Sequence, residues 1–416
     1  MNAQFDKQTT NAPRPLDGIK VLDLTSVLMG PFASQIMGDM GADVIKVESP
    51  QGDSTRQIGP GRHKQMGGLY LNTNRSKRSI AIDLKKDEGR ELLLRLALDA
   101  DVFFYNVRPQ AMARLGLSYE ALREVNPRLI YAGVFGYGQE GPYAAKPAYD
   151  DLIQGASTLS ALFARSTGSA PQYAPAAIAD RIAGMSAVNA ILAAIIERSR
   201  SGEGQRIDVP MFETMVSFIM SDHLAGLSFI PSLDEGGYQR LLTRSRRPYK
   251  TKDGYVCAVI YTDRHWRSFM TLLGRESEVD ADPRLRSLAT RTRHIDALYA
   301  EIEQVLGTRT TAEWLEVFER IDIPSLPMHD LQSIFEDPQL KATQFFGTED
   351  HPTEGKLRTL GHAASWSRSQ PVSSRHAPRH GEHSREILMQ AGLDEEEIES
   401  MFSAGIVLEN TTQEGA

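Results

Sequence analysis

The sequence predicts an α/β protein in which an open, largely parallel sheet is followed by a smaller α+β domain. In residues 16–225, short runs rich in β-branched and aromatic residues alternate with helical patterns of about ten residues. Strands separated by such helices pair in parallel through right-handed crossovers. After residue 225 the alternation stops, and no internal repeat favours a solenoid instead.

The elements expected in the first part follow one another in a regular order. A strand at 19–24 is followed by a helix at 30–41 that ends at Gly41, and then by a strand at 43–48. The pattern continues with a strand at 79–84, a helix at 87–100, a strand at 101–106, a helix at 118–126 and a strand at 128–136. Residues 204–230 predict one more strand and a mostly apolar helix.

The rest of the chain predicts a different organisation. Residues 226–325 predict the smaller domain, with a hairpin-like pair of short strands and two helices, one opening with a capping box of Thr310 and Glu313. Residues 326–416 combine helices with irregular stretches, and we expect them to return to the large domain that begins at residue 16. The polar residues 1–15 predict a disordered lead.

Composition narrows the function classes. The formal net charge is −8 and the cations are spread along the chain, which argues against nucleic acid or an anionic membrane as the main partner. The single cysteine, Cys257, excludes a disulfide framework and fits a reducing cytoplasm. The longest apolar run, residues 190–196, is much shorter than the ~20 residues of a membrane span, so we expect a soluble protein.

Ligands of open α/β sheets bind at the carboxyl ends of the strands. The first such end, residues 23–34, lacks the glycine patterns of a dinucleotide fold or a P-loop, which disfavours a dehydrogenase or an NTPase. Two basic clusters remain as candidates for an anionic ligand, and either could instead be a solvated face. The first comprises residues 74–79 with Lys85, Lys86, Arg108 and Arg114, and the second comprises residues 244–250.

One acid, Asp180, lies between small residues and a long apolar helical pattern. It could be the cap of a helix that starts at Arg181, because aspartate is a preferred capping residue. It could also be a carboxylate nucleophile, and the two roles do not exclude each other. Small neighbours would leave room for a bulky partner: Ala176, Ala177, Ala179, Ala183 and Gly184. The ten histidines show no metal-site spacing, and no G-x-S-x-G motif is present.

Several long motifs resemble one known family. In order and spacing, they are similar to those of class III CoA-transferases, the relatives of formyl-CoA transferase, carnitine CoA-transferase and α-methylacyl-CoA racemase. The motifs lie at residues 16–56, 72–89, 106–142, 147–155 and 201–213. The similarity is close from Leu16 to Glu213 and looser in the tail.

The resemblance implies a fold and a site. It implies an interlocked homodimer, with a Rossmann-like large domain built from both ends of each chain, and it places Asp180 on the catalytic aspartate. The coenzyme A contacts of the family fall on Val27, Leu28, Leu84, Lys85, Asn106 and Arg114. Ser49 stands where some relatives have an arginine beside the nucleotide.

The resemblance also implies a mechanism in which Asp180 attacks an acyl-CoA thioester and passes through a mixed anhydride and an aspartyl-CoA thioester. Such an exchange is nearly neutral in free energy, so neither ATP nor a metal is required. Racemases of the family have a histidine where this chain has Tyr149. A tyrosine hydroxyl ionises only at about pH 10, which disfavours racemization.

The sequence says less about the identity of the donor and acceptor acids than about the type of reaction. Arg246 or Arg247 could bind the distal carboxylate of a dicarboxylic substrate, or could belong to an exposed basic loop. The first alternative suits succinyl-CoA as donor and a glutarate-, itaconate-, mesaconate- or citramalate-like acceptor. No glycine-rich closing loop is recognisable in residues 225–265, which disfavours oxalate. An acyl-CoA isomerase and a non-catalytic acyl-CoA-binding subunit remain as alternative functions.

Overall fold

The structure, a computed structural model, describes residues 13–408 and contains two compact units. Unit 1 comprises residues 13–157, 175–216 and 342–408, and unit 2 comprises residues 158–174 and 217–341. Segment 158–174, which the sequence assigns to the large domain, therefore packs in unit 2. The expected disordered lead lies outside the described residues, apart from its last three.

Unit 1 contains a seven-stranded sheet of order β12-β3-β2-β1-β4-β5-β6. Its strands are β1 (Lys20–Leu24), β2 (Asp43–Glu48), β3 (Lys77–Ile82), β4 (Val102–Tyr105), β5 (Ile130–Phe135), β6 (Arg206–Pro210) and β12 (Val407–Leu408). All neighbouring strands are parallel except β12, which pairs with β3 in antiparallel fashion. The expected strands and their parallel pairing are confirmed, whereas β12 has no sequence signal because it is only two residues long.

The helices of unit 1 follow the strands as expected from the alternating pattern. They are α1 (Met29–Asp39), α2 (Gly68–Leu71), α3 (Asp87–Ala97), α4 (Pro109–Arg114), α5 (Tyr119–Val125), α6 (Asp150–Ala156), α8 (Ile178–Ser201), α17 (Ser384–Gln390) and α18 (Glu395–Ser403), with a 3-10 turn η1 (Ser54–Gln57). Helix α3 shows why they form: acids occupy its first turn and Arg95 its last, complementing the helix dipole, while Leu92 and Leu93 are buried.

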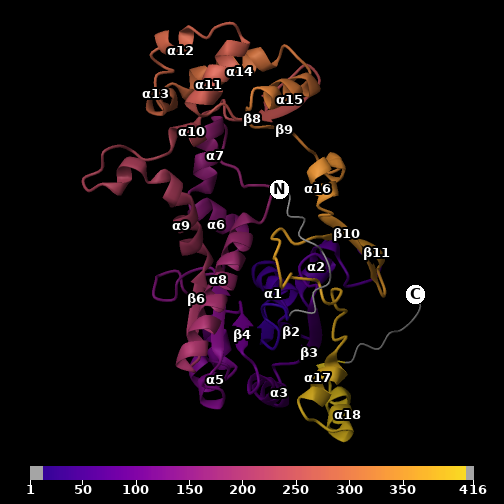
Figure 1. Cartoon of the computed structure of the whole chain (residues 1–416). Helices are drawn as coiled ribbons and strands as arrows, with labels where there is room; N and C mark the ends of the chain where they lie inside the picture. Colours follow the sequence, from indigo (N-terminus) through magenta and orange to yellow (C-terminus); the bar gives the residue numbers. More distant parts are fainter. Residues whose placement is uncertain (1–12, 409–416) are drawn as a thin grey trace. The chain divides into compact units, whose positions relative to one another are not determined.

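The core of unit 1 draws on both ends of the chain. Aromatic residues of the central strands, Phe103, Tyr105 and Tyr131, pack together in it. Ile387 of α17 and Ile398 of α18 belong to the same cluster: α17 packs against β3, and α18 packs against α17 and β12 (Figure 1). A separate hairpin, β10 (Phe346–His351) with β11 (Gly355–Leu360), also belongs to this unit.

Unit 2 has its own core, with Trp266, Phe269 and Trp314 among its buried side chains. Its three-stranded antiparallel sheet, β7-β8-β9, adds a third strand to the hairpin expected from the sequence. The capping box of Thr310 and Glu313 is confirmed at the start of α15.

The elements of unit 2 are α7 (Leu159–Thr167), η2 (Ala225–Ser228), α10 (Gln239–Leu242), β7 (Tyr249–Lys250), β8 (Tyr255–Ala258), α11 (Asp263–Leu272), α12 (Glu278–Ala281), α13 (Leu288–Arg293), α14 (Ile295–Leu306), α15 (Thr311–Arg320), β9 (Ser325–Pro327) and η3 (Ser333–Glu336). Helices α9 (Met211–His223) and α16 (Pro338–Ala342) connect the two units along the chain.

Helix α8 is long and apolar enough to cross a membrane, judged by length and composition alone. It packs against α1 and β5, as the core helix of a water-soluble protein would. Part of its surface is nevertheless open, because Met185 is 47% exposed and Ile196 is 60% exposed. The expectation of a protein without a membrane span stays a prediction.

Candidate active site

The largest pocket described in unit 1 has a volume of about 690 Å³ and lies at the carboxyl edge of the parallel sheet. It is lined by residues 24–26, 46–54, 82–85, 107, 112, 115 and 405. These segments follow the carboxyl ends of β1, β2, β3 and β4. The strand order reverses between β1 and β4, and open α/β sheets bind ligands at such a switch point.

Two of the six residues expected to contact coenzyme A, Leu84 and Lys85, line this pocket, and the side chain of Lys85 is exposed. The other four are not among the lining residues, but each lies one or two positions from one in the sequence: Val27, Leu28, Asn106 and Arg114. Arg114 lies in the last turn of α4 and is exposed, so it and Lys85 are available to phosphates. Their contact with coenzyme A stays a prediction.

Asn106 has a more specific position than the sequence indicated. Its side-chain amide donates to the carbonyl oxygen of Ser26 at 2.7 Å, and its Oδ1 accepts from the N–H of Ser26 at 3.1 Å. Both polar groups of the amide are therefore engaged with the turn between β1 and α1. The geometry favours a role in holding this turn rather than in direct binding of a ligand.

Three of the seven cations of the first basic cluster do not converge on the pocket, so the hypothesis of a shared phosphate site is wrong for these three residues. Arg75 binds Asp39 at 2.9 Å, Arg78 binds Asp43 at 2.5 Å, and Lys77 is buried against Asp23 at 3.2 Å. Lys77 and Arg78 begin β3, at the amino edge of the parallel strands. Their charges are used inside the fold because a buried cation requires an anionic partner.

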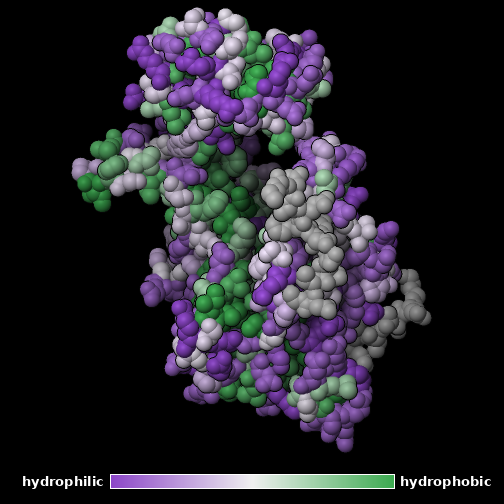
Figure 2. Space-filling view, viewed as in Figure 1, coloured by the Kyte–Doolittle hydropathy of each residue, from purple (hydrophilic) through white to green (hydrophobic). Residues whose placement is uncertain are grey.

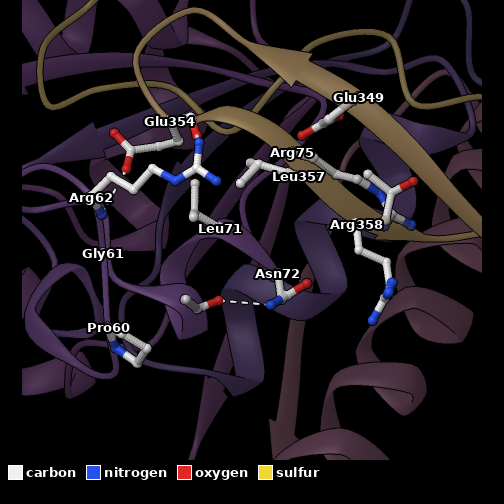
Figure 3. Close-up of a pocket in the computed structure, with 12 residues that line it drawn as sticks. Pro60, Gly61, Arg62, Leu71, Asn72, Arg75, Glu349, Glu354, Leu357 and Arg358 are labelled. Atoms are coloured by element: carbon white, nitrogen blue, oxygen red, sulfur yellow. Dashed lines mark hydrogen bonds between the residues drawn. The ribbon is translucent and has the colours of Figure 1, made fainter. Parts of the chain in front are cut away.

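A second pocket of unit 1, of about 360 Å³, is formed by residues 60–75 and the β10–β11 hairpin (Figure 3). Its cations are largely engaged. Arg62 donates to the carbonyl oxygen of Glu354 at 2.6 Å, and Arg75 binds both Asp39 and the carbonyl of Leu360. Asn72 donates to the carbonyl of Gly68. The larger pocket at the carboxyl edge is the better candidate for an extended nucleotide ligand.

Asp180 is not the cap of its helix, so this part of the sequence interpretation is wrong. Helix α8 begins at Ile178, and Asp180 is its third residue. The N–H of Asp180 donates to Oδ1 of Asp150, in the first turn of α6, at 2.9 Å. The capping role therefore falls to Asp150, thirty residues earlier in the chain.

The carboxylate of Asp180 is half-buried, and within residues 13–408 it accepts no hydrogen bond and forms no salt bridge. Burial raises the pKa of Asp180 to about 6, the nearby Asp150 carboxylate adds to the rise, and Arg181 opposes it. Buried acids elsewhere in the unit, such as Asp23 and Glu48, are each bound to a cation. An acid left without a partner and with a raised pKa is typical of a reactive group.

Most of the small residues near Asp180 allow helices to pack closely and do not leave an open space beside the carboxylate. A Cβ added to Gly184 would lie 2.7 Å from the carbonyl oxygen of Met29, so the glycine allows α8 to approach α1. Ala179 and Ala183 are also buried. Of the five residues expected to leave room, only Ala176 is exposed and Ala177 half-exposed. This packing brings the first turns of α8 onto the start of α1, which directly follows Val27 and Leu28.

Tyr149 precedes α6 and is 68% exposed. Its neighbour Asp150 is the residue that contacts the backbone of Asp180, and it was missed by the sequence interpretation. A pair of acids at the start of a helix is a recognisable signal, but it indicates only the helix end. The sequence signal does not show that the same carboxylate also caps a second helix, because that contact depends on the tertiary fold.

Arg246 and Arg247 lie in unit 2 and differ in their surroundings. Arg247 binds Glu303 at 3.0 Å. Arg246 is exposed and borders a mostly apolar pocket of about 220 Å³, whose walls include Phe163 and Phe218. Of these two arginines, Arg247 shares its guanidinium with Glu303, whereas Arg246 has no side-chain partner among the described residues. Within residues 13–408, no group of three or more histidine, cysteine, aspartate or glutamate side chains could hold a metal ion.

The chain is similar to known proteins over most of its length. A family model described as CoA-transferase family III matches residues 16–384. The succinyl-CoA:glutarate CoA-transferase of Homo sapiens is 31% identical, with 97% of this chain and 92% of the relative covered. The succinate–glutarate CoA-transferase of Agrobacterium fabrum is 35% identical, with coverages of 91% and 96%. A solved CAIB/BAIF family protein from Brucella suis has a TM-score of 0.76 at 32% identity, covering 91% of this chain and 100% of that one.

Proposed function

The chain belongs to CoA-transferase family III, and we propose that it transfers CoA from succinyl-CoA to a short dicarboxylic acid, with Asp180 as the nucleophile. Relatives over nearly the full length act on succinate and glutarate, which supports this substrate class. The observation that carries the proposed role of Asp180 is its carboxylate, half-buried and without a partner in the described residues, in the first turn of α8, a helix that packs against the start of α1.

The proposed reaction needs only carboxylates and a thiolate. A carboxylate oxygen of Asp180 attacks the thioester carbon, the C–S bond breaks, and CoA leaves as a thiolate with an acyl-aspartyl anhydride left behind. The thiolate then attacks the Asp180 carbonyl and releases the donor acid. The acceptor carboxylate attacks the carbonyl of the resulting aspartyl-CoA thioester, which expels the thiolate again and forms an acceptor–aspartyl anhydride. The thiolate then attacks the acceptor carbonyl of this anhydride, which gives the new acyl-CoA and frees the Asp180 carboxylate.

Backbone N–H groups at the start of a helix can stabilise an oxyanion, but three of those at the start of α8 have other partners. The N–H of Asp180 donates to Asp150, that of Ile178 to the carbonyl of Ala176, and that of Arg181 to the carbonyl of Ala177. The tetrahedral intermediates therefore need donors other than these three groups. The site must also exclude water, because hydrolysis of the anhydride would waste the thioester.

The function is tested by mixing the purified protein with succinyl-CoA and a panel of mono- and dicarboxylic acids, and following new thioesters by chromatography and mass. A new acyl-CoA would support the transferase and identify the acceptor. Deuterium entering the α-carbon of an acyl-CoA in heavy water would favour the isomerase. Bound thioester without any product would favour a non-catalytic subunit.

Arg246→Ala is expected to raise the KM for a dicarboxylic acceptor by about tenfold or more, because a lost charge-assisted hydrogen bond has that magnitude. Arg247→Ala is the matched control: its guanidinium is held by Glu303, so the KM should change less than about twofold. A monocarboxylic acceptor should be insensitive to both changes. An unchanged dicarboxylate KM in Arg246→Ala would refute the assignment.

We also propose that the protein is an interlocked homodimer, as the family resemblance implies. The apolar exposed face of α8 supports this, and Figure 2 shows hydrophobic surface over that helix. A second copy is the occupant that would cover such a patch without a membrane. Light scattering should give twice the mass of the chain, and the mass of a single chain at assay concentrations would contradict the dimer. A cytoplasmic location stays a prediction.

A further inference from the structure

Side-chain hydrogen bonds hold the turn between β1 and α1, one from Asp23 of β1 itself and the others from distant parts of the chain. Asp23 accepts from the N–H of Thr25 at 2.9 Å, and Lys46 donates to the carbonyl oxygen of Thr25 at 3.0 Å. Asn106 bonds both backbone groups of Ser26. Asp53 accepts from the N–H of Val27 at 3.2 Å. Neither helix nor sheet bonds account for these groups, so the shape of the turn depends on this set of side chains.

Val27 shows that the turn would not adopt this shape by itself. Its φ is 71°, in the left-handed region that β-branched residues avoid because of steric clash. A valine persists there only when the surroundings hold it. The N–H of Val27 has its hydrogen bond to Asp53, which is therefore placed to maintain the left-handed conformation.

Asp53 is itself fixed from several directions. It pairs with Lys46 at 2.9 Å, with side chains 1% and 0% exposed, and it also accepts from the N–H of Thr55. Burial would raise the pKa of Asp53, but Lys46 and the Thr55 contacts hold it below its usual range. Asp53 stays ionised, and both it and Lys46 line the pocket. A buried pair of this kind is weak in net stabilisation but strongly directional.

We infer that Asp53 is a positioning residue for CoA binding: with Lys46 it holds the Thr25–Val27 turn in the conformation that receives the coenzyme. This inference rests on the proposed function, because it takes the ligand of the pocket to be CoA. Asp53 acts through the turn and through the start of α1, and takes no part in the thioester chemistry. Its loss should therefore change binding and leave the chemical step nearly intact.

The test compares CoA affinity, measured by titration calorimetry, in wild type, Asp53→Ala and Asp43→Ala. Asp43 is a matched control because it lies on the same region of chain, at the amino end of β2, and pairs with Arg78 away from the turn. Asp53→Ala should weaken CoA binding by tenfold or more, since small displacements of a binding group have effects of that order. The kcat at saturating acyl-CoA should change less than about threefold. Asp43→Ala should bind CoA as the wild type does.

A second measurement does not depend on CoA. Amide hydrogen exchange of the ligand-free protein should become faster at Ser26, Val27 and Leu28 in Asp53→Ala and remain unchanged there in Asp43→Ala. If Asp53→Ala does not fold, Lys46→Met removes the bond to Thr25 and should show the same loss of affinity and faster exchange.

The outcomes separate the two proposals. Wild-type affinity and unchanged exchange in a folded Asp53→Ala protein would overturn the positioning role and leave the proposed function standing. If the wild type itself binds neither CoA nor acyl-CoA, the proposed function fails and this inference fails with it. A fall in kcat at unchanged affinity would also overturn the inference, because Asp53 would then act on the chemical step.

Discussion

Asp180→Asn is expected to lower the kcat of CoA transfer by at least about a thousandfold, because the amide cannot form an anhydride with the acyl group. The side chain keeps its size, and the hydrogen bond from the backbone N–H of residue 180 to the Asp150 carboxylate survives the change, because it does not involve the substituted side chain. The measurement is the initial rate of acyl-CoA exchange at saturating substrate. CoA affinity should remain close to that of the wild type.

The same variant should be at least as stable as the wild type. The pKa of Asp180 is raised above its usual value to about 6, so the folded protein favours the protonated form. Its ionised form therefore opposes folding above about pH 6, and this unfavourable contribution disappears as the pH falls toward the unfolded value. Asparagine removes it, so the Tm at pH 8 should not fall. Asp151→Asn, on the exposed start of α6, is the control for general effects of removing an acid. Substantial activity in Asp180→Asn would exclude this residue as the nucleophile.

The pH dependence of kcat/KM for the acyl-CoA donor gives a second large effect. The attacking group is the carboxylate, so kcat/KM should fall by about tenfold per pH unit below the pKa of Asp180 in the free enzyme, which is about 6. Asp150→Asn removes a negative charge that favours the protonated form of Asp180, so the acid limb should move to lower pH. At pH 5 this variant should then retain a larger fraction of its maximal kcat/KM than the wild type.

Asp150→Asn removes the negative charge at this position and keeps the hydrogen bond to α8. An asparagine at position 150 keeps an oxygen that can accept from the N–H of Asp180, so the start of α8 should remain in place. Gln154, which donates to Asp150 at 2.5 Å, can reorient its amide to suit. Asp151→Asn should leave the limb unchanged. A limb that stays at pH 6 in Asp150→Asn would show that Asp150 does not influence the titration of Asp180.

Local patterns predicted elements well where they carry a clear period. β2 was expected at residues 43–48 and is found there, and α3 begins at Asp87 as expected. The start of α8 was placed three residues too late, because an aspartate before an apolar helical pattern suggests a cap. The first turn of α8 is stabilised instead by a carboxylate from α6, and no local signal could reveal it.

Charge patterns were less informative than hydrophobic ones. The sequence predicted that Arg75, Lys77 and Arg78 belong to a solvated or phosphate-binding cluster. Each of them is instead bound to an acid at least thirty residues away in the sequence. The sequence shows which residues are charged, but it does not show which opposite charge each of them will pair with in the folded protein. Asn106 illustrates the same point, because its partner Ser26 is eighty residues distant.

The sequence by itself determined the α/β class, the order of the first strands and the edge of the sheet that carries the pocket. These depend on local periodicity and on topological rules that follow from it. Asp180 was singled out as the nucleophile only by the resemblance to a known family. Only the tertiary structure decided that Asp180 has a free carboxylate beside Asp150, that Arg246 differs from Arg247, and that Asp53 holds Val27. Each of these depends on contacts between residues remote in the chain, and the low-dielectric surroundings that make such contacts strong exist only after folding.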